Sequence, residues 1–75
     1  MAALRSHYFT TKPSKGGEYF KTGIMLFNRK IQIGTITQYK ETDKYVFFSA
    51  FNADVKEFDS FREADLWAWS SAPRK

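Results

Sequence analysis

The sequence predicts an α+β protein: a three- to four-stranded antiparallel meander with one C-terminal helix packed on one face of the sheet. Between residues 18 and 58, short segments rich in β-branched and aromatic side chains alternate with polar turns, as consecutive antiparallel strands do. A helix-capping signature follows at Ser60. The chain has 75 residues, 43% hydrophobic and 19% aromatic, so it can bury one core. We expect a single domain over residues 18–75, preceded by an irregular segment over residues 1–17.

The first two predicted strands span residues 18–27 and 31–40, and a short polar turn joins them. In the second strand, Ile33 and Ile36 have opposite parity, so an uninterrupted strand would place them on opposite faces of the sheet. Gly34 lies between them and indicates a bulge that resets the register.

Residues 45–51 form the next predicted strand and are apolar on both faces. This pattern is typical of a central strand that is covered on each side, or of one with an exposed apolar face. The polar residues 52–54 interrupt it. Residues 55–58 then form either a bent extension or a short fourth strand.

The helix is expected from about residue 60 to residue 70. Ser60 and Glu63 have the spacing of a capping box, in which the serine hydroxyl caps the backbone and the glutamate reaches back. Pro73 ends the helix, because proline lacks a backbone N–H. At about 100° per residue the apolar side chains fall on two arcs. Phe61, Ala64, Trp67 and Ala68 form one arc, and Leu66 and Trp69 form the other.

The sheet can bury only one of these two arcs directly. Near the N-terminus, Leu4, Tyr8 and Phe9 are too apolar for a free tail, so they form a short edge strand or pack back over the domain. Leu66 and Trp69 are then either core residues beneath that segment or a surface presented to a partner.

The composition argues against catalysis. The chain has no cysteine and one histidine, His7, which lies in the segment predicted to be irregular and has no acid near it in sequence. The residues 15–17, Lys-Gly-Gly, lack the spacing of a phosphate-binding loop. We therefore expect no enzymatic activity, no cofactor and no metal site. Because we find no apolar run of membrane-spanning length and no secretory signal, we expect a cytoplasmic protein without membrane contact.

Charge is distributed unevenly along the chain. Residues 1–40 contain seven basic side chains and one acid, whereas residues 41–75 contain five basic side chains and seven acids. This asymmetry either steers a charged partner or serves solubility alone. Through the first two predicted strands, basic residues accompany aromatic ones, as on surfaces that bind phosphates and stack bases. The candidate residues for binding a partner or nucleic acid are Lys12, Lys15, Lys21, Arg29, Lys30, Tyr39, Leu66 and Trp69.

The segment from Val55 to Trp67, VKEFDSFREADLW, is similar to the strand-to-helix passage of small phage-encoded inhibitors of the anti-CRISPR kind. This resemblance covers residues 55–67 only. It implies a phage or mobile-element protein that docks on a host nucleic-acid-handling complex and blocks it, in the cytoplasm of the host cell. The alternative is direct DNA or RNA binding through the basic side of the sheet, and a third reading is an assembly subunit that oligomerises through its aromatic face. The sequence leaves the partner's identity and the oligomeric state open.

Overall fold

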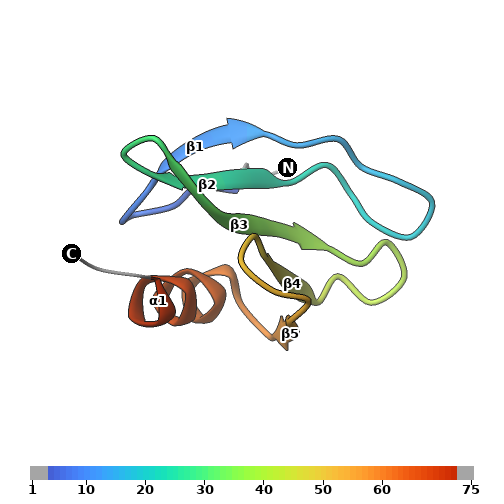
Figure 1. Ribbon diagram of the computed structural model, residues 1–75. Helices are drawn as coiled ribbons and strands as arrows, with labels where there is room; N and C mark the ends of the chain where they lie inside the picture. The colour runs from blue at the N-terminus through green and yellow to red at the C-terminus, as the bar shows by residue number, and fades with distance from the viewer. Residues whose placement is uncertain (1–3, 73–75) are drawn as a thin grey trace.

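The computed structural model describes residues 4–72 and contains one antiparallel sheet with a helix on one face (Figure 1). The strands lie in the sheet in the same order as in the chain, so each strand pairs with its neighbours in sequence. The elements are β1 (Thr10–Pro13), β2 (Ile24–Asn28), β3 (Ile31–Gln38), β4 (Tyr45–Ser49), β5 (Val55–Phe58) and α1 (Phe61–Ser71).

The α+β class, the antiparallel meander and the C-terminal helix are confirmed, but the sheet has five strands and not the three or four expected. The additional strand is β1, which lies within the segment predicted to be irregular. It pairs with β2, with Thr10 opposite Phe27 and Pro13 opposite Ile24. Turn-forming residues are tolerated here because an edge strand needs partners on one side only. Residues 55–58 form β5, a strand of their own.

A bulge in β3 brings its isoleucines to one face, as the position of Gly34 predicts. Leu26 pairs with Gly34, but the next residue of β2 pairs with Gln32, so β3 contains one extra residue, Ile33. The extra residue reverses the side-chain alternation along the strand. Ile33 and Ile36 are therefore both buried in the same core cluster.

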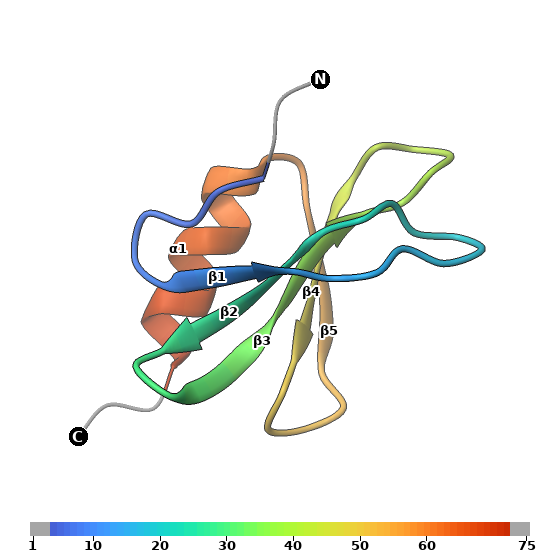
Figure 2. The same ribbon diagram turned by 90° about the horizontal axis from the view of Figure 1, so that it is seen from above.

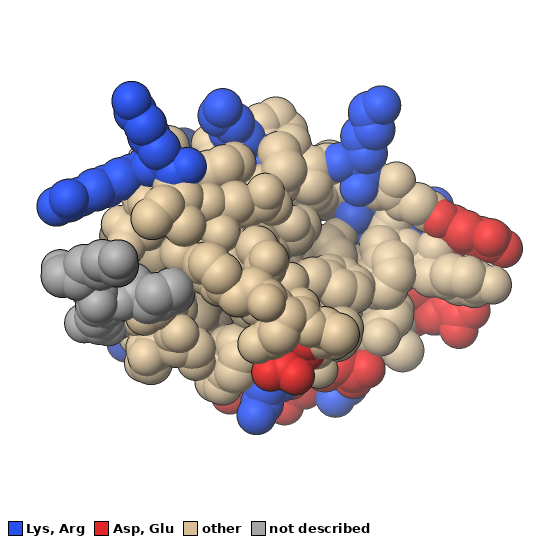
Figure 3. Space-filling view, viewed as in Figure 1, with Lys and Arg blue, Asp and Glu red and all other residues tan. Residues whose placement is uncertain are grey.

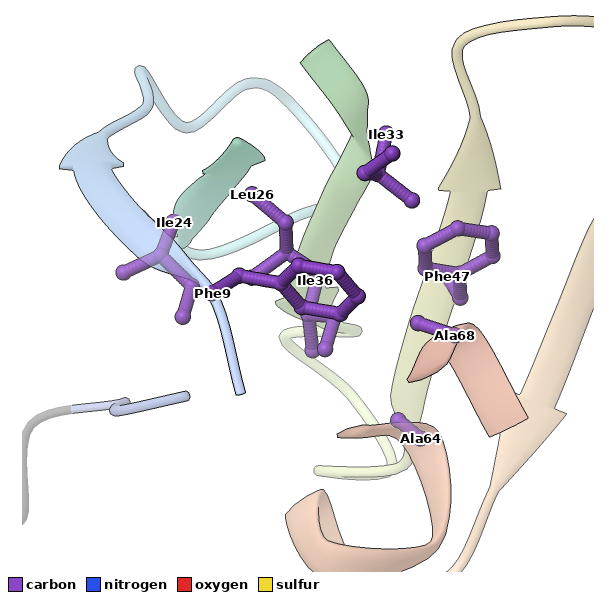
Figure 4. Close-up of a cluster of buried hydrophobic side chains, with 8 residues drawn as sticks. All are labelled: Phe9, Ile24, Leu26, Ile33, Ile36, Phe47, Ala64 and Ala68. Atoms are coloured by element: carbon purple, nitrogen blue, oxygen red, sulfur yellow. The ribbon is translucent and has the colours of Figure 1, made fainter. Parts of the chain in front are cut away.

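The core lies between the sheet and α1 (Figure 4). The helix contributes two small side chains, Ala64 and Ala68, which let it approach the sheet closely. Beside them, Trp67 packs on Phe47 of β4 in a T-shaped arrangement, with ring centroids 5.3 Å apart. The buried hydrophobic side chains of this cluster are Phe9, Ile24, Leu26, Ile33, Ile36, Phe47, Ala64 and Ala68.

The helix begins where the capping signature places it. Ser60 has an extended backbone, and its Oγ accepts a hydrogen bond of 3.3 Å from the backbone N–H of Glu63. The Ser60 hydroxyl also donates to Oε2 of Glu63, at 3.1 Å. At the other end, the N–H of Ala72 donates to the carbonyl of Ala68, and Pro73 lies outside the described residues. The N-cap satisfies a backbone donor that has no partner within the helix.

Candidate binding surface on the open face of the sheet

One face of the sheet carries the helix, and the other, which we call the open face, does not. In Figure 2, β1 crosses in front of α1, so the open face is turned toward the viewer. Side chains alternate between faces along each strand, and the register aligns the open-face residues of neighbouring strands. From one edge of the sheet to the other, the central row of this face is Lys12, Met25, Thr35, Phe48 and Val55.

The open face contains a hollow of about 640 Å³ beside this row. Its floor is mostly apolar, because Met25 and Phe48 point away from the core that α1 covers. Phe20 stands against Phe48 with ring centroids 5.2 Å apart and also stacks on Tyr39 at 4.9 Å. The residues that line the hollow are Pro13, Ser14, Lys15, Gly16, Gly17, Phe20, Met25, Thr35, Thr37 and Phe48.

The loop between β1 and β2 forms one wall of the hollow and is held by hydrogen bonds. The N–H of Ser14 donates to the carbonyl of Gly23 at 2.9 Å, and the N–H of Gly23 donates back to Oγ of Ser14 at 3.1 Å. Further along, the N–H of Lys21 donates to Gln38 at 2.8 Å, and the buried Thr37 hydroxyl donates to the carbonyl of Lys21. These bonds fix the wall against β3, so the hollow is formed before any ligand enters.

Four of the predicted basic residues lie exposed around this face, and we call them the basic rim: Lys12, Lys15, Arg29 and Lys30. Lys12 extends from β1 with Nζ 5.3 Å from the ring centroid of Phe27. Lys15 lines the hollow, and the other two form the turn between β2 and β3. Figure 3 shows Lys and Arg side chains along the upper edge, above β1 and this turn, while Asp and Glu side chains gather at the right and along the bottom.

The remaining predicted cation, Lys21, differs from the four residues of the basic rim because it forms an ion pair. It is half-buried, and its ammonium forms an ion pair with Asp43 in the turn between β3 and β4. That pairing offsets its charge. Lys21 therefore ties two loops together and contributes less to an anion-binding surface than the four exposed residues do.

Tyr39 lies beyond the far end of the hollow, in a different environment. Burial, together with the charge of Glu57 and a hydrogen bond to it, raises the pKa of Tyr39 above its ordinary value of 10.0. Its ring lines a second hollow of about 510 Å³, with Tyr19, Glu41 and Glu57 among its other lining residues. The phenol is neutral at physiological pH, and its ring stacks on Phe20, which lines the first hollow.

Leu66 and Trp69 lie on α1, on the opposite side of the sheet from the basic rim. Leu66 is 38% exposed. Trp69 is half-buried and contacts Tyr8 and Phe9 of the N-terminal segment. The predicted candidate residues therefore do not form one site, since the structure separates the basic rim, Tyr39 and the helix pair.

The candidate residues predicted from the sequence do not include three side chains that shape the hollow: Phe20, Met25 and Phe48. A signal for Phe48 was present, because residues 45–51 are apolar on both faces while one helix can cover only one of them. Met25 and Phe20 have opposite parity in the predicted strand over residues 18–27. They meet in the hollow because the register shifts by one residue between Ile24, which pairs with Ile36, and Phe20, which pairs with Tyr39.

Among residues 4–72, no three His, Asp or Glu side chains gather as metal ligands would. In the same part of the chain, no helix is both long and apolar enough to cross a membrane. Comparison of the chain with protein-family models, with curated proteins and with solved structures gives no match.

Proposed function

We propose that this protein is a non-enzymatic binding domain that binds nucleic acid through the open face of its sheet. The observation that carries the proposal is the juxtaposition of the basic rim with an apolar, aromatic hollow on one face. Lysine and arginine side chains neutralise phosphates, and exposed rings stack on bases. A surface that offers both kinds of group on one face matches the phosphates and the bases of a nucleic acid.

The lining of the hollow supports binding without catalysis. Its side chains are apolar groups, hydroxyls and the amine of Lys15, with no carboxylate or imidazole among them. Two of the hydroxyls are engaged in the loop wall, on Ser14 and Thr37. General acid–base chemistry needs a titratable group within hydrogen-bond reach of the substrate, and the hollow offers only a lysine.

A titration with fluorescently labelled oligonucleotides at about 50 and 200 mM salt tests the proposal, because each phosphate contact steepens the dependence of affinity on salt. We expect salt-sensitive binding by the wild-type domain. Lys12→Glu, Lys15→Glu and Arg29→Glu should each weaken binding and flatten the salt dependence. The matched control is Arg62→Glu, an exposed reversal on α1, which should change affinity much less. Absence of salt-sensitive binding to any oligonucleotide would refute the proposal.

A second candidate function is that of an anti-CRISPR-like inhibitor that docks on a host nucleic-acid-handling protein. Two exposed apolar side chains near the β4–β5 turn favour it: Phe51 is 52% exposed and Val55 is 53% exposed. Val55 belongs to the central row of the open face, so an apolar anchor and the basic rim share one surface. A partner protein with an acidic patch beside an apolar pocket would complement both the basic rim and this anchor.

The two candidates differ in what the free domain binds. An inhibitor should show no appreciable affinity for DNA or RNA at physiological salt and should retain a host protein in a pull-down after nuclease treatment. Phe51→Ala should then cost more affinity than any single charge reversal on the rim, because a buried aromatic anchor can contribute about 2 kcal/mol or more. For a nucleic-acid-binding domain the order of these effects is reversed.

A further inference from the structure

The hollow on the open face indicates which form of nucleic acid fits it. We infer that the ligand is a single strand and that one unpaired base enters the hollow, with Phe48 as its stacking partner and Lys12 and Lys15 at the flanking phosphates. This inference rests on the proposed function. It adds a strand preference and a base-binding site that phosphate contacts alone do not require.

The shape of the surface favours an unpaired base. The volume of about 640 Å³ falls within the range of cavities that hold small ligands. The loop that includes Gly16 and Gly17 stands beside the strands and makes the surface concave. In a duplex each base is paired and stacked inside the helix, so it would have to leave the stack to reach the floor of the hollow. A single strand offers its bases without that cost.

The floor has the chemistry of a base-stacking site. Phe48 and Met25 provide an aromatic ring and a polarisable thioether, both of which contact flat aromatic ligands favourably. Phe20 meets Phe48 with 83° between the ring planes, and this contact limits the orientations open to the Phe48 ring. Stacking on a ring tolerates every base, because every base has a π-face. We therefore expect weak sequence preference.

One polar group is placed to contact the edge of such a base. Thr35 lies between Met25 and Phe48 in the central row and is half-buried. Within residues 4–72, its hydroxyl makes no hydrogen bond, whereas the hydroxyls of Ser14 and Thr37 are both engaged. A hydroxyl both donates and accepts, so it suits more than one base edge.

Two cations lie beside the floor, one in β1 and one in the loop that follows it. Lys12 is directly opposite Met25 in the register, and Lys15 belongs to the loop wall. Phosphates that precede and follow an inserted base would pass these two ammonium groups. The path would continue along β1 toward Arg29 and Lys30, which lie at the end of the sheet where Thr10 pairs with Phe27.

The test compares a mixed-sequence single-stranded DNA of about ten nucleotides with a duplex of the same sequence, titrated at the same salt concentration. We expect the single strand to bind at least about tenfold more tightly. Phe48→Leu should weaken single-strand binding by about tenfold, within the range known for loss of one stacked base. Phe51→Leu is the matched control, because it removes an exposed ring outside the hollow, and it should leave single-strand binding within about twofold of wild type.

A second variant distinguishes loss of binding from loss of the fold. Gly17 lines the hollow, and a Cβ at this position would meet no atom within 4 Å, so Gly17→Leu should fold and narrow the entrance. It should weaken single-strand binding and leave duplex binding unchanged. Equal affinity for both forms, or single-strand binding that neither variant weakens, would overturn the inference while the proposed function stands. Absence of binding to both forms would overturn the proposed function and the inference together.

Discussion

The indole of Trp69 is stacked on the ring of Tyr8, with centroids 4.8 Å apart and 19° between the planes. Phe9 meets the same indole edge-on at 5.8 Å and is itself buried in the core. These contacts join a helix near the C-terminus to a segment near the N-terminus. Of the two alternatives that the sequence leaves for Trp69, the structure has the one in which the N-terminal segment covers it, while Leu66 keeps an exposed side chain.

The same segment is fastened by Asp65, a fully buried carboxylate on α1. It accepts hydrogen bonds from the Ser6 hydroxyl at 2.8 Å and from the backbone N–H of His7 at 2.9 Å. We expect Asp65→Ala to lower the free energy of unfolding by about 1.5–3 kcal/mol, the usual range for hydrogen bonds to a charged group. Urea unfolding measures this loss. Asp59→Ala is the control, because Asp59 forms an exposed ion pair whose removal should cost less than about 1 kcal/mol. Similar losses for both variants would contradict the role assigned to Asp65.

The parts of the fold that were predictable from sequence are those fixed by local chemistry. Ser60 and Glu63 set the start of the helix without any tertiary contact. The parity of Ile33 and Ile36, with Gly34 between them, indicates a bulge, and the structure has it at Ile33. Strand β1 was not predictable in this way. Thr10 and Thr11 suit a strand, but Pro13 and the glycines that follow it favour a loop. The segment forms a strand because it pairs with β2, and this pairing places Phe9 in the core.

The candidate site was predictable as a set of charges but not as a shape. The basic residues of the rim are visible in the sequence, whereas the partner of Lys21 is not, because Asp43 is distant along the chain. The hollow depends on where the loop after β1 folds back, and Phe20 reaches Phe48 because it pairs with Tyr39, beyond the end of β3. Long-range placement of this kind leaves no periodic signal in a single sequence.

Gly34 is a position where any side chain would be strongly unfavourable. A Cβ there would overlap the carbonyl oxygen of Phe48 and lie 2.6 Å from Cζ of Phe47. We expect Gly34→Ala to destabilise the protein by about 1–3 kcal/mol, as overpacking does. Gly17→Ala is the matched control, since a Cβ at Gly17 has open space and should leave stability unchanged or raise it by about 0.4–1 kcal/mol. Thermal melts should therefore show a clearly lower melting temperature for Gly34→Ala and an unchanged or higher one for Gly17→Ala.

The N-cap of α1 gives a smaller and separate effect. Ser60→Ala removes the acceptor for the N–H of Glu63 and should cost about 1 kcal/mol of stability. Because Ser60 is remote from the basic rim, nucleic-acid affinity should stay at the wild-type value. Ser60→Asp keeps an acceptor at the cap and should retain most of the stability. A melting temperature that does not change in Ser60→Ala would mean that this hydrogen bond is negligible in solution.

Tyr39 makes stability depend on pH in the alkaline range. Its pKa is raised in the folded state, so the neutral phenol stabilises the fold below the ordinary pKa, and this contribution is lost as the pH rises through the folded pKa. Lys44 loses its contribution in the same range, because its hydrogen bond and charge interaction with Asp59 raise its pKa. We expect the free energy of unfolding to fall less in Tyr39→Phe than in wild type as the pH rises from about 9 to about 11. Equal losses in urea unfolding across that range would show that the phenol does not contribute.

Arg29 combines a backbone constraint with a proposed binding role, and the two can be separated. Arg29 occupies the first position of a two-residue hairpin turn. Its backbone φ of 62° lies in the left-handed region, which a glycine adopts without steric cost. Arg29→Gly should raise the free energy of unfolding by about 0.5–1 kcal/mol, since relief of the strain exceeds the entropy that glycine gains on unfolding. Lys30→Gly removes the same charge from the neighbouring position, where φ is not positive, and should not stabilise the protein.

Both variants should weaken nucleic-acid binding to a similar extent, because each deletes one cation of the basic rim. A domain that becomes more stable and binds less tightly cannot have lost affinity through unfolding, so Arg29→Gly isolates the charge effect. Urea unfolding and oligonucleotide titration on the same preparations provide both readings. If Arg29→Gly binds as tightly as wild type while Lys12→Glu does not, the β2–β3 turn lies outside the bound strand and the contact surface is confined to β1 and the hollow.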